Sequence, residues 1–275
     1  MLVDFHMHST FSDGVESPES LFRHSLASNL SMISLTDHDE IDGIMMLRDA
    51  QKKWDFAQSI KIITGCEFSG NYKGKDIHIL GYRFDETDEK LMQFINYVKA
   101  ERVSRVAKMI QRCNEAGYRI TMDMLENTFP HARAYGRPHI GQLLIDNGYA
   151  KDINEVFSTV LHKDSPCYIP KVKIEVPKII DIIHTAGGLA VMAHPKLIRN
   201  DDYVVEMLEF DFDGIEAYHS KHDSTDESKY KALAMECHLF ITGGSDYHGI
   251  QGKPPARLGD FVVDSESVSK FIDLL

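Results

Sequence analysis

The stretch SPESLFRHSLASNLSMISLTDHD, residues 17–39, contains a helix signal, a strand signal and a polar cluster, in that order. Ser17 followed by Pro18 is typical of a helix start, because a serine hydroxyl caps the first turn and proline fits there. The apolar run MISLT (32–36) then predicts a buried strand. The segment TDHD (36–39) ends that strand in polar side chains. A helix that leads into such a strand is the repeating unit of an α/β protein.

Six more apolar runs are typical of strands, and helical segments lie between several of them. These runs are LVDF (2–5), KIITG (61–65), IHILGY (77–82), LAVMA (189–193), GIEAY (214–218) and LFITGG (239–244). The segment VPKIIDIIHTAGG, which ends in Gly187 and Gly188, is one of the predicted helices. Seven strands that alternate with helices predict parallel β-α units. We therefore expect an α/β fold, a seven-stranded (β/α)7 barrel rather than a sandwich.

Residues 88–169 interrupt this alternation, because they are helical in pattern and contain no clear strand. We expect a helical insertion (cap) domain at 100–169 over one end of the barrel, with the barrel itself in 1–99 and 170–275. Between residues 99 and 139, eight Lys and Arg face four Asp and Glu, an excess of +4 in a chain of net charge −12. This local excess indicates an anionic ligand, although a charged helix face is more often simply solvated.

Composition narrows the class of protein. A content of 43% hydrophobic and 26% charged residues is ordinary for a soluble globular protein, and no apolar run approaches the roughly 18–20 residues of a membrane span. The first residues lack a signal-peptide pattern, so we expect a cytoplasmic location. We also expect no membrane partner, and no obligate protein partner is evident from the sequence. Four cysteines without a C-x-x-C pair argue against a zinc ribbon and against a disulfide framework. The net charge discourages nonspecific nucleic-acid binding but not a short anionic substrate held by metal ions.

Ionisable side chains gather where the predicted strands end. The candidate metal ligands are His6, His8, Asp13, His38, Glu67, His78, His194, Asp246 and His248. In a β/α barrel the C-terminal strand ends converge on the face that carries the active site. Imidazoles mixed with carboxylates suit zinc, manganese or iron better than calcium. Nine donors exceed what one ion uses, so the sequence predicts a hydrolase with two to three divalent metal ions (Mn, Zn or Fe), bridged by Glu67.

The motifs HMHSTFSDG, TDHD, GCEFS, HILGY, AHP and GGSDYHG occur in this order. As a set, and over the whole chain, they resemble the PHP (polymerase and histidinol phosphatase) superfamily. The resemblance implies a distorted seven-stranded barrel with a trinuclear metal site. It divides the ligands into three groups: His6, His8, Glu67 and Asp246; Glu67, His78 and His194; and Asp13, His38 and His248. Asp13 stands where many members have histidine.

The insertion, with YGRPHIGQLL inside it, resembles the stand-alone PHP phosphoesterases that act on nucleotides. Those proteins remove a phosphate from nucleoside 3′,5′-bisphosphates, and related members trim short RNA from the 5′ end. Arg137 and His139 match the GRPH motif of that branch, and His222 matches its histidine after the sixth strand. The branch often has Gly-Lys-Pro where Asp164-Ser165-Pro166 stands here, preceded by Lys163, so this phosphate contact stays open.

We expect a phosphatase that acts on small nucleotides or short RNA through a metal-bridging hydroxide near Glu67. Arg137 is predicted to grip a phosphate, and His222 or His219 to protonate the leaving oxygen. The predicted catalytic residues are Glu67, Asp246, His222 and Arg137, and the predicted substrate contacts are Arg137, His139, His222 and His219. Two alternatives stay open: a phosphatase for a non-nucleotide metabolite such as histidinol phosphate, and a non-catalytic metal-binding regulatory module.

Overall fold

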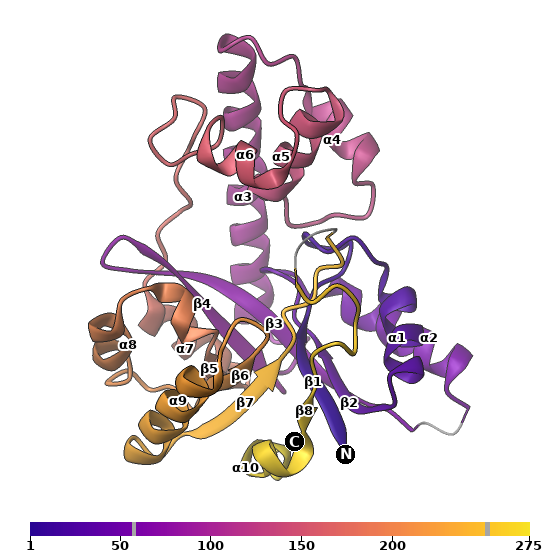
Figure 1. The fold of residues 1–275 in the computed structure, drawn as a ribbon, viewed down its shortest axis with the longest axis vertical. Coiled ribbons are helices and arrows are strands. Elements are labelled where there is room, and N and C mark those ends of the chain that lie inside the picture. The colour runs from indigo at the N-terminus through magenta and orange to yellow at the C-terminus, as the bar shows by residue number, and fades with distance from the viewer. Residues whose placement is uncertain (57–58, 251–253) are drawn as a thin grey trace.

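The computed structural model describes residues 1–56, 59–250 and 254–275. Within these ranges, eight strands form one sheet that curls into a nearly closed barrel with helices outside it (Figure 1). The strands are β1 (Leu2–Met7), β2 (Leu30–Leu35), β3 (Lys61–Tyr72), β4 (Lys75–Tyr82), β5 (Leu189–Met192), β6 (Gly214–His219), β7 (Phe240–Gly244) and β8 (Val263–Asp264). Their order in the sheet is β7-β6-β5-β4-β3-β2-β1-β8. The predicted α/β class is confirmed.

The predicted count of seven strands is wrong, since the described chain has eight. The additional strand, β8, pairs antiparallel with β1 and is too short to stand out as an apolar run. The segment after β7 also bonds to β1: the Asp246 N–H donates to the His6 carbonyl at 2.8 Å, and the His8 N–H donates to the Tyr247 carbonyl at 2.9 Å. The barrel therefore closes beside β1, through the segment that carries Asp246.

The strands are also not all parallel, contrary to the prediction. β4 runs antiparallel to both β3 and β5, whereas the pairs β1–β2, β2–β3, β5–β6 and β6–β7, each joined through a helix, are parallel. β3 and β4 are joined by Lys73-Gly74, whose φ angles are 47° and 82°. Two left-handed residues make the tight turn of a β-hairpin, and glycine adopts that conformation without strain. The hairpin sets His78 opposite Ser69, two residues from Glu67.

Helices cover the outside of the barrel (Figure 1). They are α1 (Pro18–Ala27), α2 (Asp42–Trp54), α7 (Val176–Thr185), α8 (Asp201–Met207), α9 (Ser224–Glu236) and α10 (Ser269–Ile272). The predicted start of α1 is confirmed, because the Ser17 side chain accepts a hydrogen bond from the Ser20 N–H. α7 buries Ile179, Ile180 and Ile183 in the main hydrophobic core of the barrel. No helix among the described residues combines the length and the apolar character that a membrane crossing needs.

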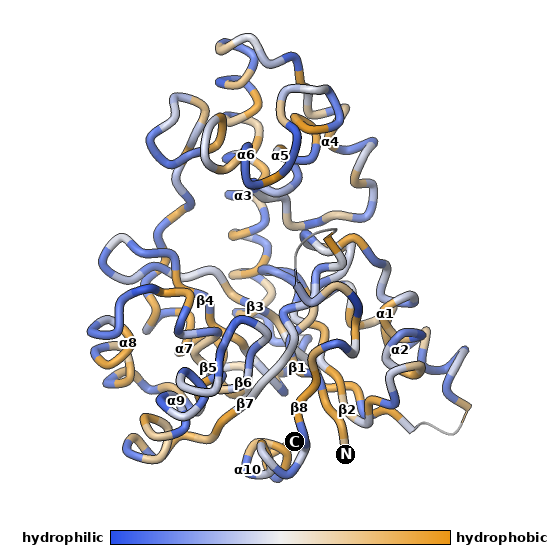
Figure 2. Tube along the Cα trace, in the orientation of Figure 1, coloured by the Kyte–Doolittle hydropathy of each residue, from blue (hydrophilic) through white to orange (hydrophobic). Residues whose placement is uncertain are grey.

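A helical body follows β4 and stands away from the barrel (Figure 1). It comprises α3 (Glu89–Glu115), α4 (Met122–Thr128), α5 (Arg137–Asp146) and α6 (Ile153–Ser158). α3 joins two hydrophobic cores: Leu91 and Val98 pack in the barrel core, whereas Val106 and Ile110 pack in a separate core with α4–α6. Figure 2 shows the corresponding alternation of hydrophobic and hydrophilic residues along α3. The predicted boundary at 99/100 falls inside this one helix, and the role of the helical body as a cap stays a prediction.

Candidate metal centre and substrate cleft

The structure brings all nine predicted metal ligands together at one end of the barrel. Four groups of side chains have ligand atoms within 4.8 Å of one another: His8, Asp13, His38 and His248; His6, His8, Glu67 and Asp246; His38, Glu67 and His78; and His6, Glu216 and His219. The second group is identical to a set that the family resemblance implied. The first adds His8 to the predicted set of Asp13, His38 and His248.

Glu67 lies at the centre of this cluster. Its Oε1 is 2.8 Å from His78 Nδ1 and 2.8 Å from His194 Nε2, which joins the third predicted set. Its Oε2 is 3.1 Å from both His8 Nε2 and His38 Nδ1. One carboxylate therefore faces imidazoles from four segments, two at each of its oxygens. This arrangement suits a ligand that bridges two cations, each held in part by imidazoles.

Charge in the cluster favours ionised carboxylates. Burial alone would raise the pKa of the Glu67 carboxyl, but the imidazoles of His38, His78 and His6 hold it well below its usual range. The pKa of the Asp246 carboxyl is held low against burial in the same way, first of all by His248. Burial opposes a proton on His8, yet Asp246 and Glu67 raise the pKa of this imidazole to about 9. The ionised carboxylates are therefore stabilised by positive charge nearby. A bound metal ion would supply that charge in place of protons on the imidazoles, because metal ligation needs ionised carboxylates and neutral imidazoles.

Buried nitrogen and oxygen atoms of the cluster indicate whether a metal ion fits there. His6 Nε2, His8 Nε2, His38 Nδ1 and Asp13 Oδ1 are buried and make no well-aligned hydrogen bond with the described residues, although each lies 3.1–3.4 Å from an oppositely charged partner in the cluster. Such atoms are costly in a protein interior unless a partner satisfies them. All four belong to the ligand groups above, so the donor set fits divalent cations with mixed nitrogen and oxygen ligation.

Glu216 is a buried member of the site that the sequence analysis did not identify. Its Oε1 accepts from His6 Nδ1 at 2.9 Å, and its Oε2 accepts from the His194 N–H at 2.7 Å. A carboxylate behind a metal-ligating imidazole fixes its ring orientation and its tautomer. The signal was present in GIEAY (214–218), where an acidic residue stands inside an apolar strand.

Asp37 and Asp39 support the loops around the ligands. Asp37 accepts from the Ser9 N–H at 2.8 Å and from the hydroxyls of Ser9 and Ser12, so it holds the loop between His8 and Asp13. Asp39 accepts from the Ser69 N–H at 2.8 Å and from Arg102 Nε at 2.8 Å, which ties α3 to the barrel.

A cleft of about 320 Å³ opens onto the ligand cluster. This volume lies within the range of small-molecule sites. The residues around the cleft include seven of the nine candidate ligands together with three cations and one further acid, namely Arg137, Lys171, Lys221 and Asp76. Lys221 Nζ donates to Asp246 Oδ2 at 2.8 Å. The sequence analysis identified Arg137 but neither lysine, because a lysine in a loop carries no local signal of burial in a site.

The other predicted substrate contacts lie beside the cleft rather than among its lining residues in the described chain. His139 Nδ1 accepts from the Gly136 N–H at 3.0 Å, and its Nε2 donates to the Ser12 carbonyl at 2.7 Å. His219 Nε2 is 3.4 Å from Asp246 Oδ2, and burial lowers the pKa of His219 to about 4. His222 Nδ1 donates to the Ala217 carbonyl at 2.9 Å. Their direct roles toward substrate stay predictions.

The fold and the site together define an α/β-barrel protein with a candidate metal centre at one end. Residues 4–193 match the PHP domain family. The chain is 31% identical to a 5′-3′ exoribonuclease of Haemophilus influenzae, over 89% of this chain and 89% of that protein. It is 27% identical to a 3′,5′-nucleoside bisphosphate phosphatase of Chromobacterium violaceum, over 90% of this chain and 87% of the relative.

A solved structure from Bifidobacterium adolescentis, described as that of a metal-dependent phosphoesterase, superposes with a TM-score of 0.86. It is 26% identical in sequence and covers 98% of this chain and 95% of its own. The chain belongs to the PHP family, as its motifs predicted. Its relatives indicate a hydrolase that acts on phosphate esters.

Proposed function

We propose that this protein is a metal-dependent phosphomonoesterase for small nucleotides, with nucleoside 3′,5′-bisphosphates as its substrates. The observation that carries the proposal is the composition of one cleft, in which metal-ligand residues and the cations Arg137 and Lys171 line the same space. Metal ligands and arginine are both suited to phosphate oxygens. The bisphosphate phosphatase among the relatives supports the choice of substrate.

Two to three divalent ions, of manganese, zinc or iron, would be held by the predicted groups. His6, His8, Glu67 and Asp246 would hold one ion, Glu67 with His78 and His194 a second, and Asp13 with His38 and His248 a third. When bound, such ions activate water and neutralise charge on the phosphoryl oxygens.

The side chains around the ions would act mainly by positioning. Glu216 holds the His6 imidazole, and the Lys221 ammonium adds a positive charge beside Asp246. The Arg137 guanidinium lies over the rings of Phe157 and Tyr168, at 5.1 and 5.5 Å from their centroids. Ring packing on a guanidinium limits its rotation, which favours two-point binding of a phosphate. His139, bonded to Gly136 directly before Arg137, would fix the start of α5 that carries this arginine.

Removal of nucleotides from the 5′ end of short RNA is a second candidate activity. The relative that favours it is the 31% identical exoribonuclease. A 3′-labelled oligoribonucleotide of a few residues tests it directly: successive loss of 5′ nucleotides supports it, and an intact oligomer under conditions that hydrolyse a bisphosphate excludes it.

The main proposal is tested by phosphate release from adenosine 3′,5′-bisphosphate, AMP and histidinol phosphate, each supplied with manganese or zinc. We expect the bisphosphate to be preferred by about tenfold or more, since a hydrogen-bonded contact to a charged group contributes about 1.5–3 kcal/mol. Preference for histidinol phosphate would refute the nucleotide assignment. No release from any ester, with metal bound, would refute the phosphomonoesterase assignment.

A further inference from the structure

A short segment of the helical body, residues 133–139, bonds to the barrel close to Asp13. The N–H groups of Arg133 and Ala134 both donate to the Phe11 carbonyl, at 2.9 and 3.3 Å. Phe11 belongs to the loop between β1 and α1, and the same loop carries Asp13. Backbone hydrogen bonds therefore attach the helical body to a loop that supplies a candidate metal ligand.

His139 makes a second connection to this loop. Its Nδ1 accepts from the Gly136 N–H at 3.0 Å, so its proton lies on Nε2, which donates to the Ser12 carbonyl at 2.7 Å. The ring is only 3% exposed and packs edge-on against Phe129 and Tyr135, with centroids 4.7 and 5.5 Å away. Burial lowers the pKa of His139, which favours the neutral ring. One neutral tautomer thus satisfies both nitrogens, and two aromatic rings limit its rotation.

The two partners of His139 directly precede predicted functional residues. Gly136 comes before Arg137, which lines the cleft, and Ser12 comes before Asp13. A buried hydrogen-bond network in which every group is satisfied is rigid. The imidazole therefore holds the predicted phosphate-binding arginine and a predicted metal ligand in a fixed relation to each other.

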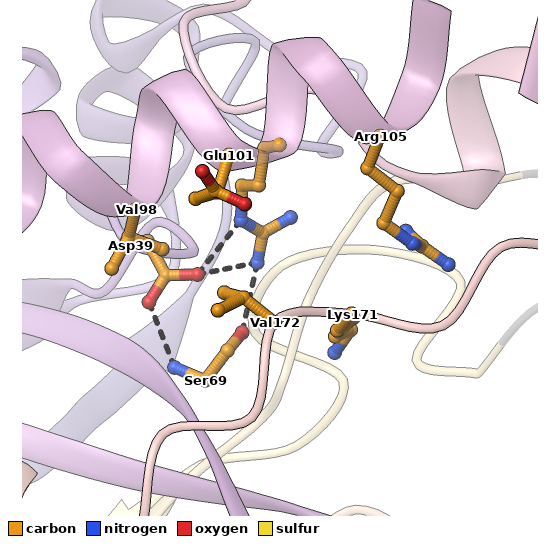
Figure 3. A pocket seen from close by; sticks show the side chains of 8 residues that line it. Asp39, Ser69, Val98, Glu101, Arg105, Lys171 and Val172 are labelled. Carbon is orange, nitrogen blue, oxygen red and sulfur yellow. Dashed lines mark hydrogen bonds and ion pairs between the residues drawn. The ribbon is translucent and has the colours of Figure 1, made fainter. Parts of the chain in front are cut away.

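Arg102 connects the helical body to a second ligand loop, the one that carries His38. Its guanidinium donates to Asp39, the residue after His38, and to the Tyr135 carbonyl at 3.3 Å. Asp39 also accepts from the Ser69 N–H on β3 at 2.8 Å, at one side of a small pocket (Figure 3). The helical body thus bonds to the loops of two ligands that belong to one candidate group.

We propose that His139 is a positioning residue that couples docking of the helical body to binding of an ion by Asp13, His38 and His248. The inference rests on the proposed function only in that an ion binds this group. The other predicted ligands lie within strands or within two residues of a strand end, so the sheet positions them. Coupling between two sites is reciprocal, so an ion bound at this group strengthens the docking by the same factor.

Variants of His139 test the connection through zinc binding to the metal-stripped protein, measured by calorimetry. The asparagine amide reaches the position of Nδ1, so His139→Asn keeps an acceptor for Gly136 and loses the bond to Ser12. The glutamine amide reaches the position of Nε2, so His139→Gln keeps a donor for Ser12. For His139→Asn we expect the affinity for one ion to fall at least about fivefold, the lower end of typical coupling between sites, and for His139→Gln a smaller change. The control His131→Asn, at an exposed position of the helical body, should bind zinc like the wild type.

The variant Asp13→Asn identifies the ion concerned, because it weakens a ligand of this group. The binding step that His139→Asn weakens should be the step that Asp13→Asn weakens or abolishes. Unchanged zinc binding in His139→Asn, or equal weakening in His139→Gln, overturns the proposal.

Hydrogen exchange tests the reciprocal effect in the wild-type chain and so does not depend on the folding of a variant. We expect zinc to slow exchange at the amides of Arg133 and Ala134 at least about fivefold. The amide of Val156, in the separate core of the helical body, should change much less. Equal exchange at Arg133 and Ala134 with and without zinc overturns the coupling. Neither measurement uses a phosphate ester, so the two results decide this proposal even if the protein hydrolyses none of the esters and the proposed function fails.

Discussion

Glu67 is the residue on which the candidate centre converges, since imidazoles from four segments lie within 3.1 Å of its two oxygens. Among the described residues, neither Asp13 nor Asp246 matches that position, because Asp13 shares no ligand group with Glu67 and Asp246 shares only one. Its side chain is 1% exposed, so its charge is screened little by solvent.

Replacing Glu67 with Gln keeps the shape of the side chain but removes its charge. We expect metal content to fall and phosphate release to drop by more than about 100-fold. This drop exceeds the effect of removing a residue that only orients a metal ligand. Metal content by mass spectrometry, measured beside phosphate release, checks both. Glu206→Gln is the control, because Glu206 pairs with Lys73 at the surface. Full metal content in Glu67→Gln would remove Glu67 from the centre.

Glu216 provides a milder test at the same scale. The variant Glu216→Gln removes the carboxylate that orients His6 and should weaken metal affinity about 10- to 100-fold, the usual effect of a lost partner behind a ligand. Activity at saturating metal should recover most of its wild-type value, and a metal titration of activity measures this. An unchanged titration curve would show that His6 needs no such support.

Most of the candidate metal ligands were found because they follow apolar runs in the sequence, whereas Glu67 and His78 lie within β3 and β4 and reach the site because the two strands are longer than those runs. Glu216 was missed because a single acid inside an apolar run carries no sign of its partner, and Lys171 because it lies in a segment without periodicity. Their environments come from segments far apart in the sequence: His6 meets Glu216 across 210 positions.

At the scale of elements, α3 and the β3–β4 hairpin place the site. α3 is anchored in both hydrophobic cores, and Arg102 in its middle bonds to three different elements. Its guanidinium donates to Asp39, to Ser69 Oγ at 2.9 Å and to the Tyr135 carbonyl at 3.3 Å. It therefore connects the loop after His38, strand β3 and the loop before Arg137.

The variant Arg102→Met should destabilise the protein, because Asp39 is 1% exposed and would lose its charged partner. Removing one partner of a fully buried ion pair lowers the free energy of unfolding by about 3–5 kcal/mol. Because Arg102 is partly exposed, we expect the free energy of unfolding to fall by about 3 kcal/mol or less. Urea unfolding measures it. Lys108→Met, on an exposed position of the same helix, should stay within about 0.5 kcal/mol of the wild type. Equal stability of the two variants would contradict the role of Arg102.

Whether a segment is a helix or a strand was easier to predict from the sequence than whether two strands run parallel or antiparallel. The helical pattern after residue 88 identified the helical body, whereas the hairpin was missed because its polar middle, 69–76, hid the continuation of both strands. The turn signal Lys73-Gly74 lay in that polar stretch. An antiparallel pair replaced the expected helix-linked crossover, and β8 escaped notice because two residues give no periodic pattern.

At the scale of the whole molecule, three cations of an acidic protein gather at one cleft. The net charge is −12, and the cleft holds Arg137, Lys171 and Lys221. The same cleft holds four acids, Asp13, Glu67, Asp76 and Asp246, so a positive field that attracts an anion would need bound metal ions. The basic excess between residues 99 and 139 pointed to such a ligand, but of its arginines only Arg137 lines the cleft. Arg112 instead caps the Tyr168 carbonyl, and Arg102 pairs with Asp39.

The central claim is that metal ions at the cluster around Glu67 enable hydrolysis of a phosphate monoester. The most direct measurement strips the protein of metal with a chelator, removes the chelator, and follows phosphate release from adenosine 3′,5′-bisphosphate as manganese or zinc is restored. We predict loss of activity in the stripped protein and its return with between two and three ions bound per chain. Full activity in the metal-free protein would contradict the claim.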